Sequence, residues 1–192
     1  MVRLASVVLR VSTHDWRNAG FPCGIWKLSE TCVSINEGDG APCLLAGLLG
    51  HDGEIQVAGF ETLHSLVDCS NTTNEIGLEA IDHLMVRARN SYLTLHELAK
   101  SLGVPVSSDE NGEESVWLDS VRIDLVPSPE LPVPAELWGI AFRVTDIDEV
   151  VIRLGGDVIG SPKPARQAGQ RVAVFRSRAN LGIPTALVDL RG

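Results

Sequence analysis

The 192-residue sequence predicts an α+β protein with two consecutive βαβββ units. The first observation is a pattern that occurs twice. In each copy an apolar strand, IDHLMVRA from Ile81 and WGIAFRVT from Trp138, precedes a helical stretch that ends at glycine. The second observation is that each copy finishes with an apolar segment holding one aspartate, VRIDLV and TALVDL. A repeat of this length indicates two similar units that complete one core together. A site is then expected between the sheets of the two units.

The N-terminal segment, residues 1–77, is predicted to be rich in β-strands and to lack a long helix. The stretch EGDG at 37–40 indicates a tight turn, so the strands on either side of it are expected to pair as a hairpin. A polar stretch at 68–77 marks the domain boundary. The expected strands are 4–11, 31–36, 43–49 and 54–68.

The remaining residues, 78–192, are predicted to form one domain of two units, 79–127 and 136–192. In the first unit a helix is expected from about Ser91 to Leu102, because apolar residues recur on one face and Gly103 follows. A proline-rich linker leads to the second unit, in which Asp146 or Thr145 begins a helix that ends by Gly155. The expected strands are 80–88, 104–107, 115–119 and 121–126 in the first unit, and 137–144, 157–160, 170–177 and 184–190 in the second.

The composition narrows the class of partner. A net charge of −9 argues against general affinity for nucleic acid or for an anionic membrane surface. No apolar run approaches the roughly 20 residues of a membrane span, and Arg10 interrupts the N-terminal one, so a cytoplasmic protein is expected. The four cysteines contain no CxxC pair, which argues against structural zinc and favours reduced thiols.

The order βαβββ, used twice, resembles the vicinal oxygen chelate superfamily, and so do IDHLMV at 81–86, RIDLV at 122–126 and LWGIAFRVTDIDEVVIRLG at 137–155. PKPARQAGQRVAVFRS at 162–177 is similar to a segment of uncharacterised glyoxalase-like proteins. The resemblance implies a curled mixed β-sheet around a cleft. The N-terminal segment is then either a degenerate further module or a separate β-rich extension.

The resemblance also implies positions for metal ligands on the first and last strands of each unit. His83, Asp124 and Asp189 fall on three of these positions, whereas Gly139 occupies the fourth and has no donor. One imidazole and two carboxylates suit a divalent iron, zinc, manganese or nickel ion. Against this, Arg122 and Arg87 could neutralise Asp124, and His83 could be an ordinary hydrogen-bonded strand residue.

Ligand-binding candidates come from charge and aromatic character. Residues 158–188 contain no acidic residue but several basic ones, which either attract an anion or face solvent. Trp117 and Trp138 flank the predicted site strands and either stack on a planar ligand or pack in the core. The candidate substrate-binding residues are Arg87, Trp117, Arg122, Trp138, Arg166 and Arg171.

The sequence supports three hypotheses about function, each from a different class of protein. The favoured one is a small-molecule-binding, glyoxalase-like protein with an incomplete metal site, because Gly139 stands at a ligand position. The alternative is a divalent-metal-dependent lyase, isomerase or dioxygenase that acts on a small oxygen-bearing substrate. A third is an interaction subunit, with a homodimer left open, whose N-terminal third covers an edge strand or forms an interface. Whether the protein is an enzyme is undecided at this point.

Overall fold

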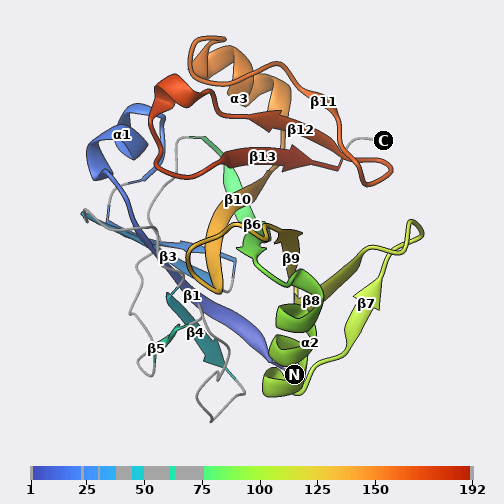
Figure 1. Ribbon diagram of the computed structural model, residues 1–192. Coiled ribbons are helices and arrows are strands. Elements are labelled where there is room, and N and C mark those ends of the chain that lie inside the picture. Colours follow the sequence, from blue (N-terminus) through green and yellow to red (C-terminus); the bar gives the residue numbers. More distant parts are fainter. Residues whose placement is uncertain are drawn as a thin grey trace.

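The computed structural model describes residues 2–22, 24–29, 31–37, 45–49, 61–63 and 76–190, of which the segments 45–49 and 61–63 are described by their backbone. Two mixed β-sheets pack face to face in this part of the chain (Figure 1). The smaller sheet is N-terminal. The larger sheet holds both βαβββ units, as the sequence predicts.

The smaller sheet has the strand order β2-β3-β1-β4-β5. A short helix, α1 (Thr13–Asn18), follows β1 and was not predicted; the side chain of Ser12 caps it by accepting a hydrogen bond from the backbone N of Asp15. The strands are β1 (Arg3–Arg10), β2 (Ile25–Leu28), β3 (Thr31–Asn36), β4 (Leu45–Leu49) and β5 (Glu61–Leu63).

Two expectations for this region are wrong. The strands at 31–36 and 43–49 do not pair with each other, because β1 lies between them, parallel to β3 and antiparallel to β4. Reduced thiols were expected, but Cys32 on β3 is disulfide-bonded. The other cysteines, Cys23, Cys43 and Cys69, lie outside the described residues.

The larger sheet has the order β11-β12-β13-β10-β6-β9-β8-β7. Its first unit comprises β6 (Leu78–Ala88), α2 (Ser91–Leu102), β7 (Val106–Ser108), β8 (Glu114–Leu118) and β9 (Val121–Pro127). Its second unit comprises β10 (Ala135–Val144), α3 (Ile147–Leu154), β11 (Lys163–Pro164), β12 (Arg171–Val174), the 3₁₀ helix η1 (Ser177–Ala179) and β13 (Thr185–Asp189).

Both long helices begin and end where the sequence predicts. Asn90 caps α2 by accepting from the backbone N of Leu93, and Gly103 ends it in the left-handed conformation at φ 65°. Asp146 caps α3 by accepting from the backbone N of Asp148 and of Glu149. The strand expected at 157–160 is reduced to one bridge between Ile159 and Phe175.

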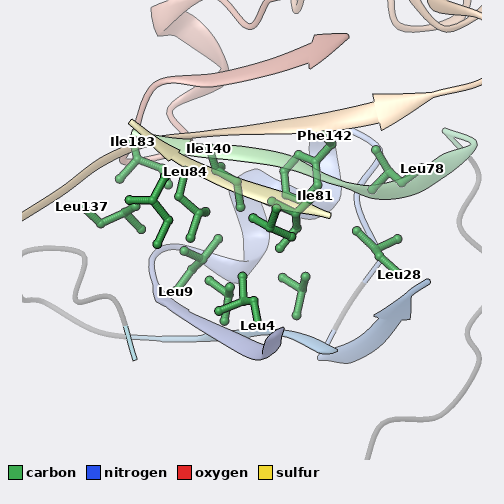
Figure 2. Close-up of a cluster of buried hydrophobic side chains, with 14 of the residues drawn as sticks. Leu4, Leu9, Leu28, Leu78, Ile81, Leu84, Leu137, Ile140, Phe142 and Ile183 are labelled. Atoms are coloured by element: carbon green, nitrogen blue, oxygen red, sulfur yellow. The ribbon is translucent and has the colours of Figure 1, made fainter. Parts of the chain in front are cut away.

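One hydrophobic core joins the two sheets. Leu4 and Leu9 of β1 face Leu84 of β6 and Ile140 of β10 across the interface (Figure 2). The smaller sheet therefore covers a face of the larger sheet at its two central strands. The expectation that the N-terminal third covers an edge strand is wrong for the described residues, because β7 and β11 form the edges of the larger sheet.

The smaller sheet repeats the pairing of the larger one. Going from β2 to β5, its successive pairs are antiparallel, parallel, antiparallel and parallel. The run from β8 through β9, β6 and β10 to β13 has the same sequence of pairings, with a helix after the corresponding first strand. The described strands of the smaller sheet thus follow the same alternation of antiparallel and parallel pairs as the larger sheet.

Candidate functional site

A cavity of about 780 Å³ opens on the face of the larger sheet opposite the smaller sheet. Side chains alternate between the two faces of a strand, so Leu84 and Val86 of β6 enter the core while their neighbours His83 and Met85 line the cavity. Both units contribute to the lining. Among the sequence candidates, it includes His83, Trp117, Arg122, Asp124 and Arg166.

His83 is oriented by the residue that precedes it. The pairing of β6 with β10 passes from His83↔Ala141 to Ile81↔Phe142, so Asp82 sits at a β-bulge. Its carboxylate Oδ2 is 2.9 Å from His83 Nδ1, and its Oδ1 is 3.2 Å from Arg143 Nη2. Because the carboxylate is an acceptor, Nδ1 carries the proton, and Nε2 is the ring nitrogen left for a ligand.

Asp82 stays ionised in spite of its burial. Burial alone would raise the pKa of this carboxyl group, but the hydrogen bonds and charges of His83 and Arg143 outweigh burial and hold the pKa below its ordinary value. The residue is 6% exposed. Asp82 is therefore a fixed negative charge that positions His83.

This arrangement predicts an effect of acid on stability. The pKa of Asp82 is lower in the folded than in the unfolded protein, where it is about 3.9. Its contribution is thus present above that pH and lost as the pH falls through the lower folded value. Asp82→Asn should reduce the free energy of unfolding near neutral pH and weaken its dependence on pH in the acid range, measured by urea unfolding. Glu97→Gln, an exposed change on α2, is the control; an unaltered pH profile in Asp82→Asn would contradict the assignment.

Arg122 and Asp124 form an ion pair within the cavity. Nε and Nη2 of Arg122 lie 3.0 and 2.8 Å from Asp124 Oδ2. The guanidinium carbon lies 5.9 Å from the ring centre of Trp117 on the neighbouring strand, within cation–π range. The indole of Trp117 is 42% exposed, so it presents a flat apolar surface to the cavity.

The cavity mouth is bridged by a second ion pair. Arg166, in the loop between β11 and β12, pairs with Glu113, in the turn between β7 and β8. Both side chains are more than half exposed. The loop of the second unit therefore reaches across to the first unit.

Asp189 lies on the other face of the sheet. It is 1% exposed, accepts hydrogen bonds from Arg171 at 2.6 and 3.1 Å, and accepts another from the backbone N of Ile147 at the start of α3. Arg171 also pairs with Asp148 at 2.9 Å, and these carboxylates raise the pKa of its guanidinium. The structure thus separates Asp189 and Arg171 from His83 and Asp124, and Val188 takes the cavity side of β13.

Arg87 and Trp138 are also outside the cavity lining. Arg87 pairs with Glu136 on the adjacent strand β10. Trp138 is half-buried at an irregularity in the β6–β10 pairing between Leu137 and Gly139.

The register of the central strands shows which residues of the second unit correspond to His83 and Asp124. The antiparallel pairs His83↔Ala141 and Met85↔Gly139 lie on either side of a local two-fold axis between β6 and β10. Rotation about this axis places Gly139 where His83 stands and Ala141 where Met85 stands. Asp124 pairs with Met85, so its counterpart on β13 is the residue that pairs with Ala141. That residue is Ala186. The second unit offers glycine and alanine at these positions.

The donors therefore do not fit the divalent metal that the resemblance implies. His83 and Asp124 remain on the cavity face, but Asp124 is already paired with Arg122. Within the part of the chain that the structure describes, no group of three His, Cys, Asp or Glu side chains could hold a metal ion. Three protein ligands are usual for a catalytic zinc or a non-haem iron site.

Sequence reasoning missed the apolar half of the cavity. Val172 and Val188 line it and form a hydrophobic cluster with Ala141 and Ala186. Alternation in RVAV at 171–174 and TALVDL at 185–190 would have placed these residues on one face. These side chains carry no donor or acceptor atom, so a pattern of polar residue types does not reveal them.

Comparison with known proteins places the fold. No family model matches the chain, and no curated protein matches it significantly. A fusion of a xylose isomerase-like TIM barrel with a 4-hydroxyphenylpyruvate dioxygenase aligns over 99% of this chain at a TM-score of 0.64 and 13% identity. This chain spans about half of that protein, 49% of its length. The chain has the vicinal oxygen chelate fold.

Structures of methylmalonyl-CoA epimerases match a smaller part of the chain. The enzyme from Mycobacterium tuberculosis aligns over 63% of this chain and 94% of its own, with a TM-score of 0.49 and 14% identity. A variant of the Streptomyces coelicolor enzyme aligns over 60% of this chain and all of its own, with a TM-score of 0.44 and 17% identity.

The helices that accompany the vicinal oxygen chelate fold here are short. The described α-helices have 6, 12 and 8 residues. Among the described residues, none of the helices has the length and apolar character needed to cross a membrane.

Proposed function

We propose that the protein binds a small organic molecule in this cavity and does so without a resident divalent metal. The observation that carries the proposal is the cavity itself, whose volume of about 780 Å³ suits a small ligand. Its lining combines apolar and aromatic side chains with polar and charged groups that could orient a ligand. Trp117 is a large aromatic side chain left 42% exposed within it, which supports contact with a ligand.

The chemistry at the four positions where the resemblance implies metal ligands supports binding rather than metal catalysis. Asp124 is engaged by Arg122, and the counterparts Gly139 and Ala186 carry no donor atom. His83 retains one ring nitrogen that can hydrogen-bond a ligand, because Asp82 holds the other. The functional groups of the site are thus suited to recognition.

A fragment screen tests the binding. We expect members of a library of small aromatic and aliphatic fragments to give ligand-observed NMR signals of binding, and we expect Trp117→Ala to abolish most of them. Ile152→Ala, an 82% exposed change on α3, is the control and should leave the hits unchanged. Hits that persist in Trp117→Ala, or a screen with no hits at all, would contradict binding at this cavity.

Elemental analysis of the purified protein tests the second half of the proposal. We expect no transition metal in stoichiometric amount after extensive dialysis. A tightly held, stoichiometric metal that is lost in His83→Ala would overturn it in favour of a metal-dependent enzyme, and would restore His83 as a ligand.

A further inference from the structure

The cavity joins two chemically different halves. The part that β12 and β13 contribute is aliphatic, with Val172 and Val188 in the lining, and the loop between β11 and β12 adds Arg166, Gln167 and Gln170. The half built by β6, β9 and β8 carries His83, Arg122 and Trp117. An occupant of both halves needs an apolar body and at least one polar group.

The arginines of the lining are compensated. Arg122 pairs with Asp124 and Arg166 with Glu113. Two more carboxylates, Asp109 and Glu114, also line the cavity, so two arginines stand against four carboxylates and the formal charge of the lining is −2 with histidine neutral. Hydrogen bonds from the backbone N of Glu113 and from Asn111 hold the pKa of Asp109 below its ordinary value, so it remains ionised at neutral pH. An anionic group would therefore enter an unfavourable field.

Two more arginines of the basic tract expected from the sequence are also paired with carboxylates. Arg171 pairs with Asp148 and Asp189, and Arg178 pairs with Asp157. Asp148 and Asp157 precede residue 158, and Asp189 follows residue 188. The sequence between 158 and 188 therefore contains none of the carboxylates that pair with its arginines. These ion pairs weaken the attraction that the tract could exert on an anion.

A cation is disfavoured at the polar end for a different reason. The Arg122 guanidinium already lies beside the Trp117 ring, so a second positive charge there would be repelled. Nε and Nη2 of Arg122 face Asp124, and no described residue offers an acceptor to Nη1. This nitrogen can donate a hydrogen bond to an acceptor atom of a ligand.

We propose that the cavity takes an uncharged, planar aromatic molecule that carries a hydrogen-bond acceptor. The ring lies against Trp117, the acceptor faces Arg122 Nη1, and the apolar body rests on Val172 and Val188. This inference rests on the proposed function, since it names the class of ligand for the same site.

Three probes with one ring system and different charges test the proposal: 2-naphthamide, 2-naphthoate and 2-naphthylmethylammonium. By calorimetry on the full chain at low salt, 2-naphthamide should bind at least about tenfold more tightly than either charged analogue. Asp124→Asn releases the Arg122 charge and should raise affinity for 2-naphthoate about tenfold. Glu110→Gln is the control, because Glu110 lies in the acidic turn at 109–114 but outside the cavity lining, and it should leave the affinity for 2-naphthoate unchanged.

Each other outcome overturns the assignment. Tightest binding of either charged probe contradicts an uncharged ligand, and an unchanged affinity of Asp124→Asn for 2-naphthoate contradicts compensation of Arg122 by Asp124. If none of the three probes binds while library fragments do, the ligand class is wrong and the proposed function stands. If no fragment binds either, both fail. Thermal unfolding of each variant shows that the comparison concerns folded protein.

Discussion

Replacing Trp16 with alanine is expected to lower the free energy of unfolding by about 3–5 kcal/mol, the range for removing a fully buried large aromatic side chain. Trp16 is 0% exposed. Its ring lies 4.5 Å from that of Phe21 and 6.3 Å from that of Phe142 on β10, centre to centre. Its Nε1 also donates a hydrogen bond of 2.8 Å to the backbone oxygen of Leu181. The side chain thus ties the N-terminal segment to the larger sheet.

Urea unfolding followed by circular dichroism measures this loss. Trp16→Phe keeps most of the packing and gives up the hydrogen bond, so it should lose less than the alanine variant. Trp117→Ala removes the same side chain from the exposed cavity surface and should change stability by less than about 1 kcal/mol. Equal losses at the two tryptophans would show that Trp16 is not part of a shared core.

Replacing Gly139 with alanine is expected to destabilise the protein by about 1–3 kcal/mol, because overpacking a tight site displaces its neighbours. A Cβ atom at this position would lie 2.7 Å from Met85 Cε and 2.9 Å from the backbone oxygen of Pro184. The methionine can move, but the backbone oxygen accepts a hydrogen bond from Ile140 N and holds β10 against the start of β13. The glycine is therefore required by close packing between these two strands.

Gly156→Ala supplies a matched control for the same chemical change. No atom lies within 4 Å of a Cβ built at Gly156, so the free energy of unfolding should stay within about 0.5 kcal/mol of the original. If Gly139→Ala is equally neutral, β13 yields easily and a larger side chain could stand there. A destabilised Gly139→Ala instead explains why this position holds no metal ligand.

Local signals in the sequence sufficed for the second and third helices and for most strands of the larger sheet. Asn90 and Gly103 bracket α2 with groups that satisfy the helix ends, and Asp146 does the same at the start of α3. These signals act between residues a few positions apart. They are therefore visible without knowledge of the tertiary fold.

Pairing between distant strands was less accessible. The EGDG sequence at 37–40 favours a turn, but a turn does not decide which strands become neighbours, and β1 lies between β3 and β4. The structure does not place Asp189 in the cavity, where the sequence analysis expected it, for a related reason. Alternation separates it from Val188, yet a single strand does not reveal which of its faces borders the cavity.

The support that the smaller sheet gives to the larger one has a consequence for how the cavity adapts to its contents. β6, which contributes His83 and Met85 to the cavity, and its neighbour β10 pack on their other face against the smaller sheet (Figure 2). The rim of the cavity is joined by Arg166 and Glu113, an exposed ion pair of a kind that contributes about 0–1 kcal/mol. If the cavity binds ligands of different shape, we therefore expect the 165–170 loop and the 109–114 turn to move more than the strands at its base.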